Sequence, residues 1–125
     1  MLSEAPIAPA LPASDLARAR AFYEQALELS VTEEDPGGVT FKCGGGTALL
    51  VYPSEFAGTN KATAAAFRVD DLDAVMSRLR ERGVVFEDYD LPGLKTVEGV
   101  ATFGDSKGAF FTDTEGNIIG LAQMG

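Results

Sequence analysis

Histidine is absent from this chain, and cysteine occurs only once, as Cys43. The imidazole and thiolate groups that most often bind transition metals or activate nucleophiles are therefore missing or isolated. A single cysteine also excludes an intramolecular disulfide, which agrees with a reducing compartment. We expect Cys43 to be a small buried side chain, and we expect any function to use no metal and no other cofactor.

Basic residues and long apolar runs are scarce as well. The chain has 10 Lys and Arg against 19 Asp and Glu, a formal charge of -9 at pH 7 that repels phosphate backbones and anionic lipids. No apolar run approaches the roughly 18 residues that cross a bilayer. The prolines within 1–13 and the lack of a basic start are unlike a signal peptide. We therefore expect a soluble cytoplasmic protein with no nucleic-acid or membrane partner.

Apolar residues, in contrast, make up 46% of the 125 residues, enough for one compact domain with its own core. Two segments, 14–29 and 71–82, have apolar residues at helical spacing. Ser14 is a candidate N-cap for the first segment, and Gly83 offers a left-handed C-terminal stop for the second. The spacing predicts two helices.

Short β-prone runs surround both predicted helices in the same order. One run precedes each helix, and the others follow it; they are 7–13, 30–34, 39–43 and 47–52 for the first helix, and 63–69, 84–89, 100–103, 109–112 and 118–122 for the second. An Asp-Leu pair begins both helical segments, about half a chain apart, which indicates an internal duplication.

The repeated pattern predicts an α+β fold in a single domain, 1–125, built from two tandem βαβββ modules. We place module one at about 5–53, a linker at about 54–61, and module two at about 62–124. Glycines at 44–46 are expected to form a turn, because no lysine follows them and the next residues are β-prone.

Three segments make the chain similar to a known family, the glyoxalase, bleomycin-resistance and extradiol-dioxygenase group, also called the vicinal oxygen chelate superfamily. They are Leu11–Leu16, Ala21–Tyr23 and Phe111–Asn117, in the family's order. The resemblance implies two modules whose strands form a curled mixed sheet around a cavity, with the helices outside. It also implies a homodimer, in which the modules of two chains complete a cavity.

Members of this family that use a metal hold it with side chains from four strands. The resemblance carries those positions onto Ala8, a position at or beside Val51, Ala64 and Gly120. None of these four side chains has a lone pair to donate, and beside Val51 only the Tyr52 phenol could offer one. The chain is therefore identified with the metal-free branch, in which the cavity binds a small molecule. Acidic clusters such as Asp113 with Glu115 lack the spacing of a calcium loop and are expected to be turns, caps and solvated edges.

Strand alternation predicts which side chains line the cavity. Arg68 shares a face with Ala64, while Val51 and Leu49 are expected to point inward from their own strand. The complete predicted ligand-binding set is Ala8, Val51, Ala64, Arg68, Phe86, Tyr89, Phe103 and Gly120. The region 91–109 is expected to form a mobile flap at the cavity mouth.

Such an apolar cavity suits a hydrophobic, aromatic or cationic ligand, bound for sequestration or drug resistance. A second hypothesis is a cofactor-free lyase or isomerase in which a cavity Glu, Asp or Tyr transfers a proton, with Glu87, Tyr89 and Asp90 as candidates. A third is an interaction module with a closed cavity. The sequence assigns no catalytic residue, and whether the protein is an enzyme stays open at this point.

Overall fold

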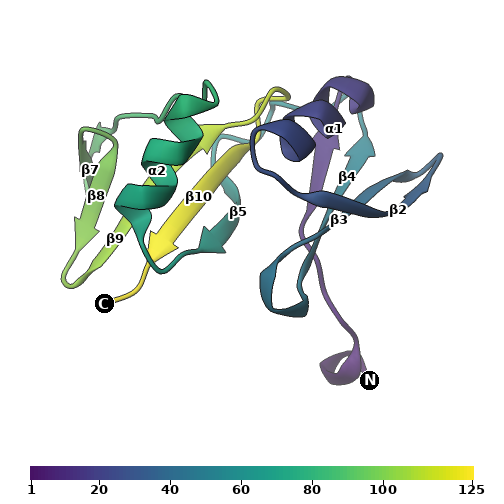
Figure 1. Cartoon of the computed structure of the whole chain (residues 1–125), viewed down its shortest axis with the longest axis horizontal. Coiled ribbons are helices and arrows are strands. Elements are labelled where there is room, and N and C mark those ends of the chain that lie inside the picture. The colour runs from purple at the N-terminus through teal and green to yellow at the C-terminus, as the bar shows by residue number, and fades with distance from the viewer.

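The computed structural model describes every residue of the chain, 1–125, as two halves that lie side by side (Figure 1). A short 3-10 helix, η1 (Leu2–Glu4), comes first. The first half contains β1 (Ala10–Ala13), α1 (Leu16–Gln25), β2 (Ser30–Asp35), β3 (Gly38–Lys42), the 3-10 turn η2 (Gly44–Gly46) and β4 (Ala48–Pro53). The second half contains β5 (Thr63–Arg68), α2 (Leu72–Glu81), β6 (Asp90–Leu91), β7 (Leu94–Val97), β8 (Val100–Phe103), β9 (Ser106–Thr112) and β10 (Ile118–Gln123).

The two halves repeat one sheet topology. The first sheet has the order β1-β4-β3-β2 and the second β5-β10-β9-β8-β7-β6. In each, the first strand of the half pairs in parallel with the last, β1 with β4 and β5 with β10, while the other pairs are antiparallel. The α+β fold of two tandem modules is confirmed, with two separate mixed sheets in place of one continuous sheet.

Both helices begin at an aspartate. Asp15 caps α1 and Asp71 caps α2, each accepting a backbone N–H three residues later. Ser14 is therefore not the cap that we predicted. Gly83 has φ 87°, the left-handed conformation expected after α2. The first helix ends earlier than predicted, and Glu28, just beyond it, has φ 60°, which is uncommon for a residue other than glycine.

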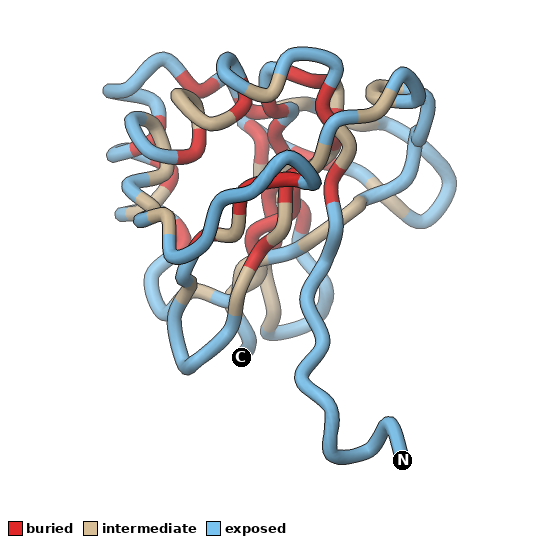
Figure 2. Tube along the Cα trace, turned by 90° about the vertical axis from the view of Figure 1, so that its right-hand side faces the viewer, coloured by how far each residue is buried: buried red, intermediate tan, exposed pale blue.

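The core lies between the helices and one face of each sheet, where the tube in Figure 2 is red. Tyr23 of α1, Phe41 of β3 and Phe111 of β9 have no exposed surface. The rings of Tyr23 and Phe41 lie 5.5 Å apart. Burial of each such ring stabilises the fold by about 1.5–3 kcal/mol, so this face decides how the strands are oriented.

Two predicted cavity residues belong to this core. Val51 lies opposite Leu11 in the register of β4 and β1, and both belong to the core, with exposed fractions of at most 1%. Leu49, also on β4, is 2% exposed. Phe86 is 9% exposed and packs edge-on against Phe111, with ring centroids 5.8 Å apart. Val51 and Phe86 therefore pack in the core and lie outside the lining of the cavity between the modules.

The region 91–109 is not a loop. It supplies β7, β8 and the start of β9, which extend the second sheet outward (Figure 1). Asp88 fastens this extension, since its carboxylate accepts hydrogen bonds from Thr96 Oγ1 at 2.7 Å and from the Gly99 N–H at 2.9 Å. The flap prediction is therefore corrected to a hydrogen-bonded strand extension.

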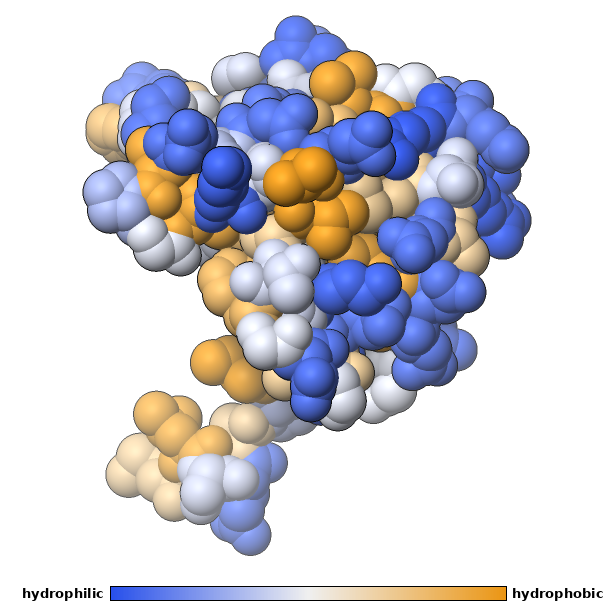
Figure 3. Space-filling view, turned by 90° about the vertical axis from the view of Figure 1, so that its left-hand side faces the viewer, coloured by the Kyte–Doolittle hydropathy of each residue, from blue (hydrophilic) through white to orange (hydrophobic).

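Residues 1–9 extend away from the body and are exposed throughout (Figure 2). Leu2 is 78% exposed and Ile7 95%. In the space-filling view the same segment stands clear of the body, and much of its surface is apolar (Figure 3). None of the helices has the length and apolar character needed to cross a membrane.

Candidate functional site

The two modules meet along a boundary that we call the seam, between β1–β4 on one side and β5–β10 on the other. β1 and β5 are the edge strands of the two sheets. At the end of the seam where β1 stops and β5 starts, polar side chains join the modules. At the other end, where β1 starts and β5 stops, two cavities open.

The turn Asp113–Asn117 closes the first end of the seam. The hydroxyl of Tyr23, on α1, donates to Asp113 Oδ2 at 2.6 Å, and Asn117 Nδ2 donates to the carbonyl of Pro12 at 2.9 Å. Burial and the adjacent Asp113 carboxylate raise the pKa of Tyr23, so the hydroxyl stays a donor. We call this group, together with Glu115, the polar clasp.

Glu115 completes the polar clasp at the N-terminus of α1. Its buried carboxylate accepts hydrogen bonds from Arg18 Nε at 2.8 Å, the Asp15 N–H at 2.9 Å and Ser14 Oγ at 3.1 Å. Burial alone would raise the pKa of Glu115, but these donors outweigh it and lower the pKa to about 2. Asp113–Asn117 forms the predicted hairpin turn between β9 and β10, but Asp113 and Glu115 are 6% and 5% exposed, so their side chains are buried and not at a solvated edge.

A second, exposed connection joins the helices of the two modules. Glu28 Oε1 accepts hydrogen bonds from Arg78 at 2.8 Å and Arg82 at 2.9 Å, both on α2. Arg82 also donates to the carbonyl of Gln25 at 2.7 Å. These contacts fix the distance between the C-terminal end of α1 and the last turns of α2.

The larger cavity, which we call the seam cavity, has a volume of about 390 Å³. Its lining comes from both modules and consists of Ile7, Pro9, Cys43, Gly44, Thr47, Ala48, Leu49, Ala65, Ala66, Phe67 and Arg68. The volume lies within the range of about 300–1,000 Å³ that is typical of small-molecule sites. An open cavity of this size argues against the interaction module with a closed interior.

Arg68 is the only charged side chain of the seam cavity. The other polar side chains are Thr47, whose hydroxyl donates to the Gly44 carbonyl at 2.6 Å, and Cys43, whose pKa is raised by burial. Burial therefore keeps Cys43 a neutral thiol and a poor nucleophile. The cavity offers apolar walls, one cation and no acid–base pair.

Of the other predicted ligand-binding residues, three lie in the seam cavity or next to its lining residues in the sequence. Arg68 is part of the lining. Ala8 lies in the exposed segment before β1, between the lining residues Ile7 and Pro9. Ala64 lies at a β-bulge in β5 and packs against the core.

Tyr89, Phe103 and Gly120 lie in the second module, outside the lining of the seam cavity. The ring of Tyr89 packs edge-on against Phe110, with centroids 5.6 Å apart. Phe103 is 51% exposed. Gly120 is closely surrounded, since a Cβ there would lie 3.5 Å from Ala66 and 3.7 Å from Phe110.

Sequence reasoning missed two groups of residues. Ile7, Pro9 and Thr47 line the seam cavity just before β1 and β4; they fall within the predicted β-prone runs 7–13 and 47–52 but were not among the predicted ligand-binding residues. Asp113 and Glu115 were visible in the sequence, but nothing in their spacing showed that a turn of module two would lie against α1. Only the packing of the two modules reveals either group.

The fold and the seam cavity define a class, tandem βαβββ proteins with a cavity between the two modules. The profile of the Glyoxalase/Bleomycin resistance protein/Dioxygenase superfamily matches residues 7–121. The chain belongs to this superfamily. No curated protein sequence matches it.

Solved structures of the superfamily resemble this one along nearly the whole chain. TnmS3, an antibiotic binding protein from Streptomyces sp. CB03234, is 27% identical with a TM-score of 0.69, over 93% of this chain and 92% of that one. Lactoylglutathione lyase from Agrobacterium tumefaciens is 22% identical with a TM-score of 0.71, over 96% and 93%. The fosfomycin resistance protein FosX from Listeria monocytogenes is 16% identical with a TM-score of 0.68, over 95% and 92%.

The residues of this chain do not fit the metal ion that many superfamily members hold. Ala8, Val51, Ala64 and Gly120 offer no donor atom in their side chains, and Val51 points into the core. No group of three or more His, Cys, Asp or Glu side chains is arranged to hold a metal ion anywhere in the chain. The side chains at these positions therefore supply no site for a metal ion.

Proposed function

We propose that this protein binds a small organic molecule in the seam cavity, without a metal ion, and that its role is sequestration. The observation that carries the proposal is an open cavity of about 390 Å³, walled by apolar groups from both modules and bearing one cation, Arg68. Apolar walls with a few placed polar groups are what small-molecule sites share.

The lining also narrows the class of ligand. Arg68 favours a neutral or anionic molecule over a cationic one, since a guanidinium repels cations and pairs with carboxylates. The cationic ligand allowed by the sequence is therefore set aside. TnmS3 is an antibiotic binding protein at 27% identity, which supports binding of an organic molecule here.

Calorimetric titration with 2-naphthoate, 2-naphthamide and 2-naphthylmethylamine tests this proposal, because the three probes share a ring system and differ in charge. We expect the acid and the amide to bind in the presence of EDTA, and the amine to bind at least tenfold more weakly. Arg68→Ala should weaken the acid about tenfold, while the matched surface change Lys95→Ala leaves it unchanged. Absence of binding until zinc is added would overturn metal independence.

The protein is also proposed to be a homodimer. An apolar segment, residues 1–9, projects from the body, with Ile7 and Leu2 exposed to solvent. Its burial against a second copy would remove apolar surface from water. Sedimentation equilibrium should give a dimer mass for the full chain and a monomer mass for the double change Leu2→Ser, Ile7→Ser; a monomer mass for the unaltered chain contradicts the proposal.

No observation favours the alternative of a cofactor-free lyase or isomerase. Burial and the neighbouring Glu87 carboxylate raise the pKa of Tyr89, which makes it a weaker acid. Glu87 accepts a hydrogen bond from the Thr112 hydroxyl at 3.2 Å, and Asp90 lies in the short strand β6. None of the three candidates lines the seam cavity. Cytoplasmic residence stays a prediction from the sequence alone.

A further inference from the structure

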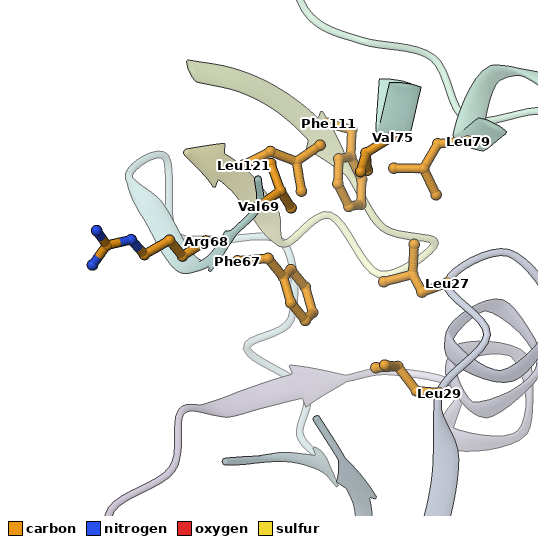
Figure 4. A pocket seen from close by; sticks show the side chains of 9 residues that line it. All are labelled: Leu27, Leu29, Phe67, Arg68, Val69, Val75, Leu79, Phe111 and Leu121. Carbon is orange, nitrogen blue, oxygen red and sulfur yellow. The ribbon is translucent and has the colours of Figure 1, made fainter. Parts of the chain in front are cut away.

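A second cavity lies where the segment after α1 and the helix α2 approach the end of β5 (Figure 4). Its volume is about 180 Å³. The lining consists of Leu27, Leu29, Phe67, Arg68, Val69, Val75, Leu79, Phe111 and Leu121. Leu27 and Leu29 come from module one and the others from module two, so this helix-side cavity also lies at the seam.

The chemistry of the helix-side cavity is uniform. Arg68 is its only polar residue, and Figure 4 shows the Arg68 guanidinium pointing away from the space that the eight apolar side chains surround. A ligand there would find no hydrogen-bond donor or counter-ion from a side chain. Leu27, Val69 and Val75 are only half-buried, so the cavity is partly open to solvent. A charged group placed inside it would lose part of its hydration without replacement, which favours uncharged apolar molecules.

The size of the helix-side cavity selects among apolar molecules. An engineered cavity of about 150 Å³ lined by Leu, Ile and Phe stays dry and binds benzene. At about 180 Å³ the present cavity has room for one substituted ring and is too small for the naphthalene-based probes together with their substituents.

The surrounding contacts connect the walls of this space. Glu28 lies between Leu27 and Leu29, and its left-handed backbone, φ 60°, interrupts the regular chain direction there. Its ion pairs with Arg78 and Arg82 connect this segment to α2, which supplies Val75 and Leu79. Both walls of the cavity are therefore connected through Glu28, which lies outside the lining.

We propose that the helix-side cavity is a second ligand site, separate from the seam cavity, which takes one uncharged monocyclic apolar molecule. Phe67 and Arg68 line both cavities, one on each side of β5. Occupation of one site therefore acts on a strand segment that forms the wall of the other. This proposal does not depend on the ligand of the seam cavity.

Methyl-selective NMR titration of the unaltered protein with toluene, benzoate and benzylamine tests the site. We expect toluene to shift the methyl signals of Leu27, Val75 and Leu79 at saturation, and the two charged analogues to leave them unchanged. Signals of Ile7 and Leu49 report the seam cavity separately. Shifts confined to Ile7 and Leu49, no shifts at all, or equal shifts from benzoate would overturn the proposal.

A filling variant gives an independent measurement. Val75 is partly exposed on α2, so Val75→Phe fills the helix-side cavity with little strain. Its toluene affinity should fall at least tenfold, whereas the matched control Val97→Phe, at a position 68% exposed outside both cavities, should keep it. Undiminished toluene binding by a folded Val75→Phe protein would also overturn the proposal.

Discussion

The two ends of the seam differ in polarity: one is held by buried polar side chains, and the other is lined mainly by apolar ones. At the end that holds the polar clasp, buried carboxylates, a tyrosine and an amide satisfy one another. At the other end, Phe67 and Arg68 separate two cavities whose walls are mainly apolar. Buried polar networks demand one geometry, whereas apolar walls tolerate small displacements. The clasp therefore fixes how the modules pack, which leaves the far end free to hold ligands.

The largest expected effect follows from removal of the centre of the clasp. Asp113→Ala leaves Tyr23 and Asn117 with buried groups that have lost their partner. We expect a loss of about 4 kcal/mol in the free energy of unfolding, measured by urea denaturation. Asp70→Ala, at an exposed aspartate, should change it by less than about 0.5 kcal/mol. An equal loss of unfolding free energy in Asp113→Ala and Asp70→Ala would contradict the idea that the polar clasp fixes how the modules pack.

A smaller effect, dependent on pH, is expected at Glu115. The folded-state pKa of about 2 lies below the ordinary glutamate value of 4.5, so the stabilisation by Glu115 is present above pH 4.5 and is lost as pH falls through 2. Glu115→Gln should cost about 2 kcal/mol at pH 7, and the difference from the unaltered protein should shrink between pH 5 and 2. A difference that is independent of pH would mean that the charge of Glu115 contributes nothing.

A still smaller effect is expected at the open end. Glu28→Gln removes the exposed ion pairs with Arg78 and Arg82, which should cost about 0.5–1 kcal/mol at low salt and almost nothing in about 1 M NaCl. Glu33→Gln, at an exposed glutamate, is the matched control. Loss that persists at high salt would show that Glu28 acts through the geometry of its hydrogen bonds with Arg78 and Arg82 and not through its charge.

The smallest effect on stability is expected for Arg68, at the boundary of the two cavities. Because its side chain is exposed and makes no ion pair within the chain, Arg68→Ala should change the free energy of unfolding by less than about 0.5 kcal/mol. The same variant should lose affinity for 2-naphthoate. A strong loss of stability would place Arg68 among the residues that hold the modules together.

The sequence predicted the elements better than their faces. Apolar spacing and Asp-Leu starts located both helices, because these signals are local. Val51 and Phe86 were expected at the cavity but pack in the core, because residue type and strand alternation do not tell which face meets the helices. The strands of 90–97 were missed, since they are short and are held by pairing with β8.

The sequence by itself determined the duplicated βαβββ pattern and the family, because both depend on residue type and spacing alone. The tertiary structure decided that Asp113 and Glu115 are buried against α1, and that Arg68 lies between two cavities. These features join residues from different modules, and the energy that selects them, burial and hydrogen bonding across the seam, exists only after both modules have folded and packed.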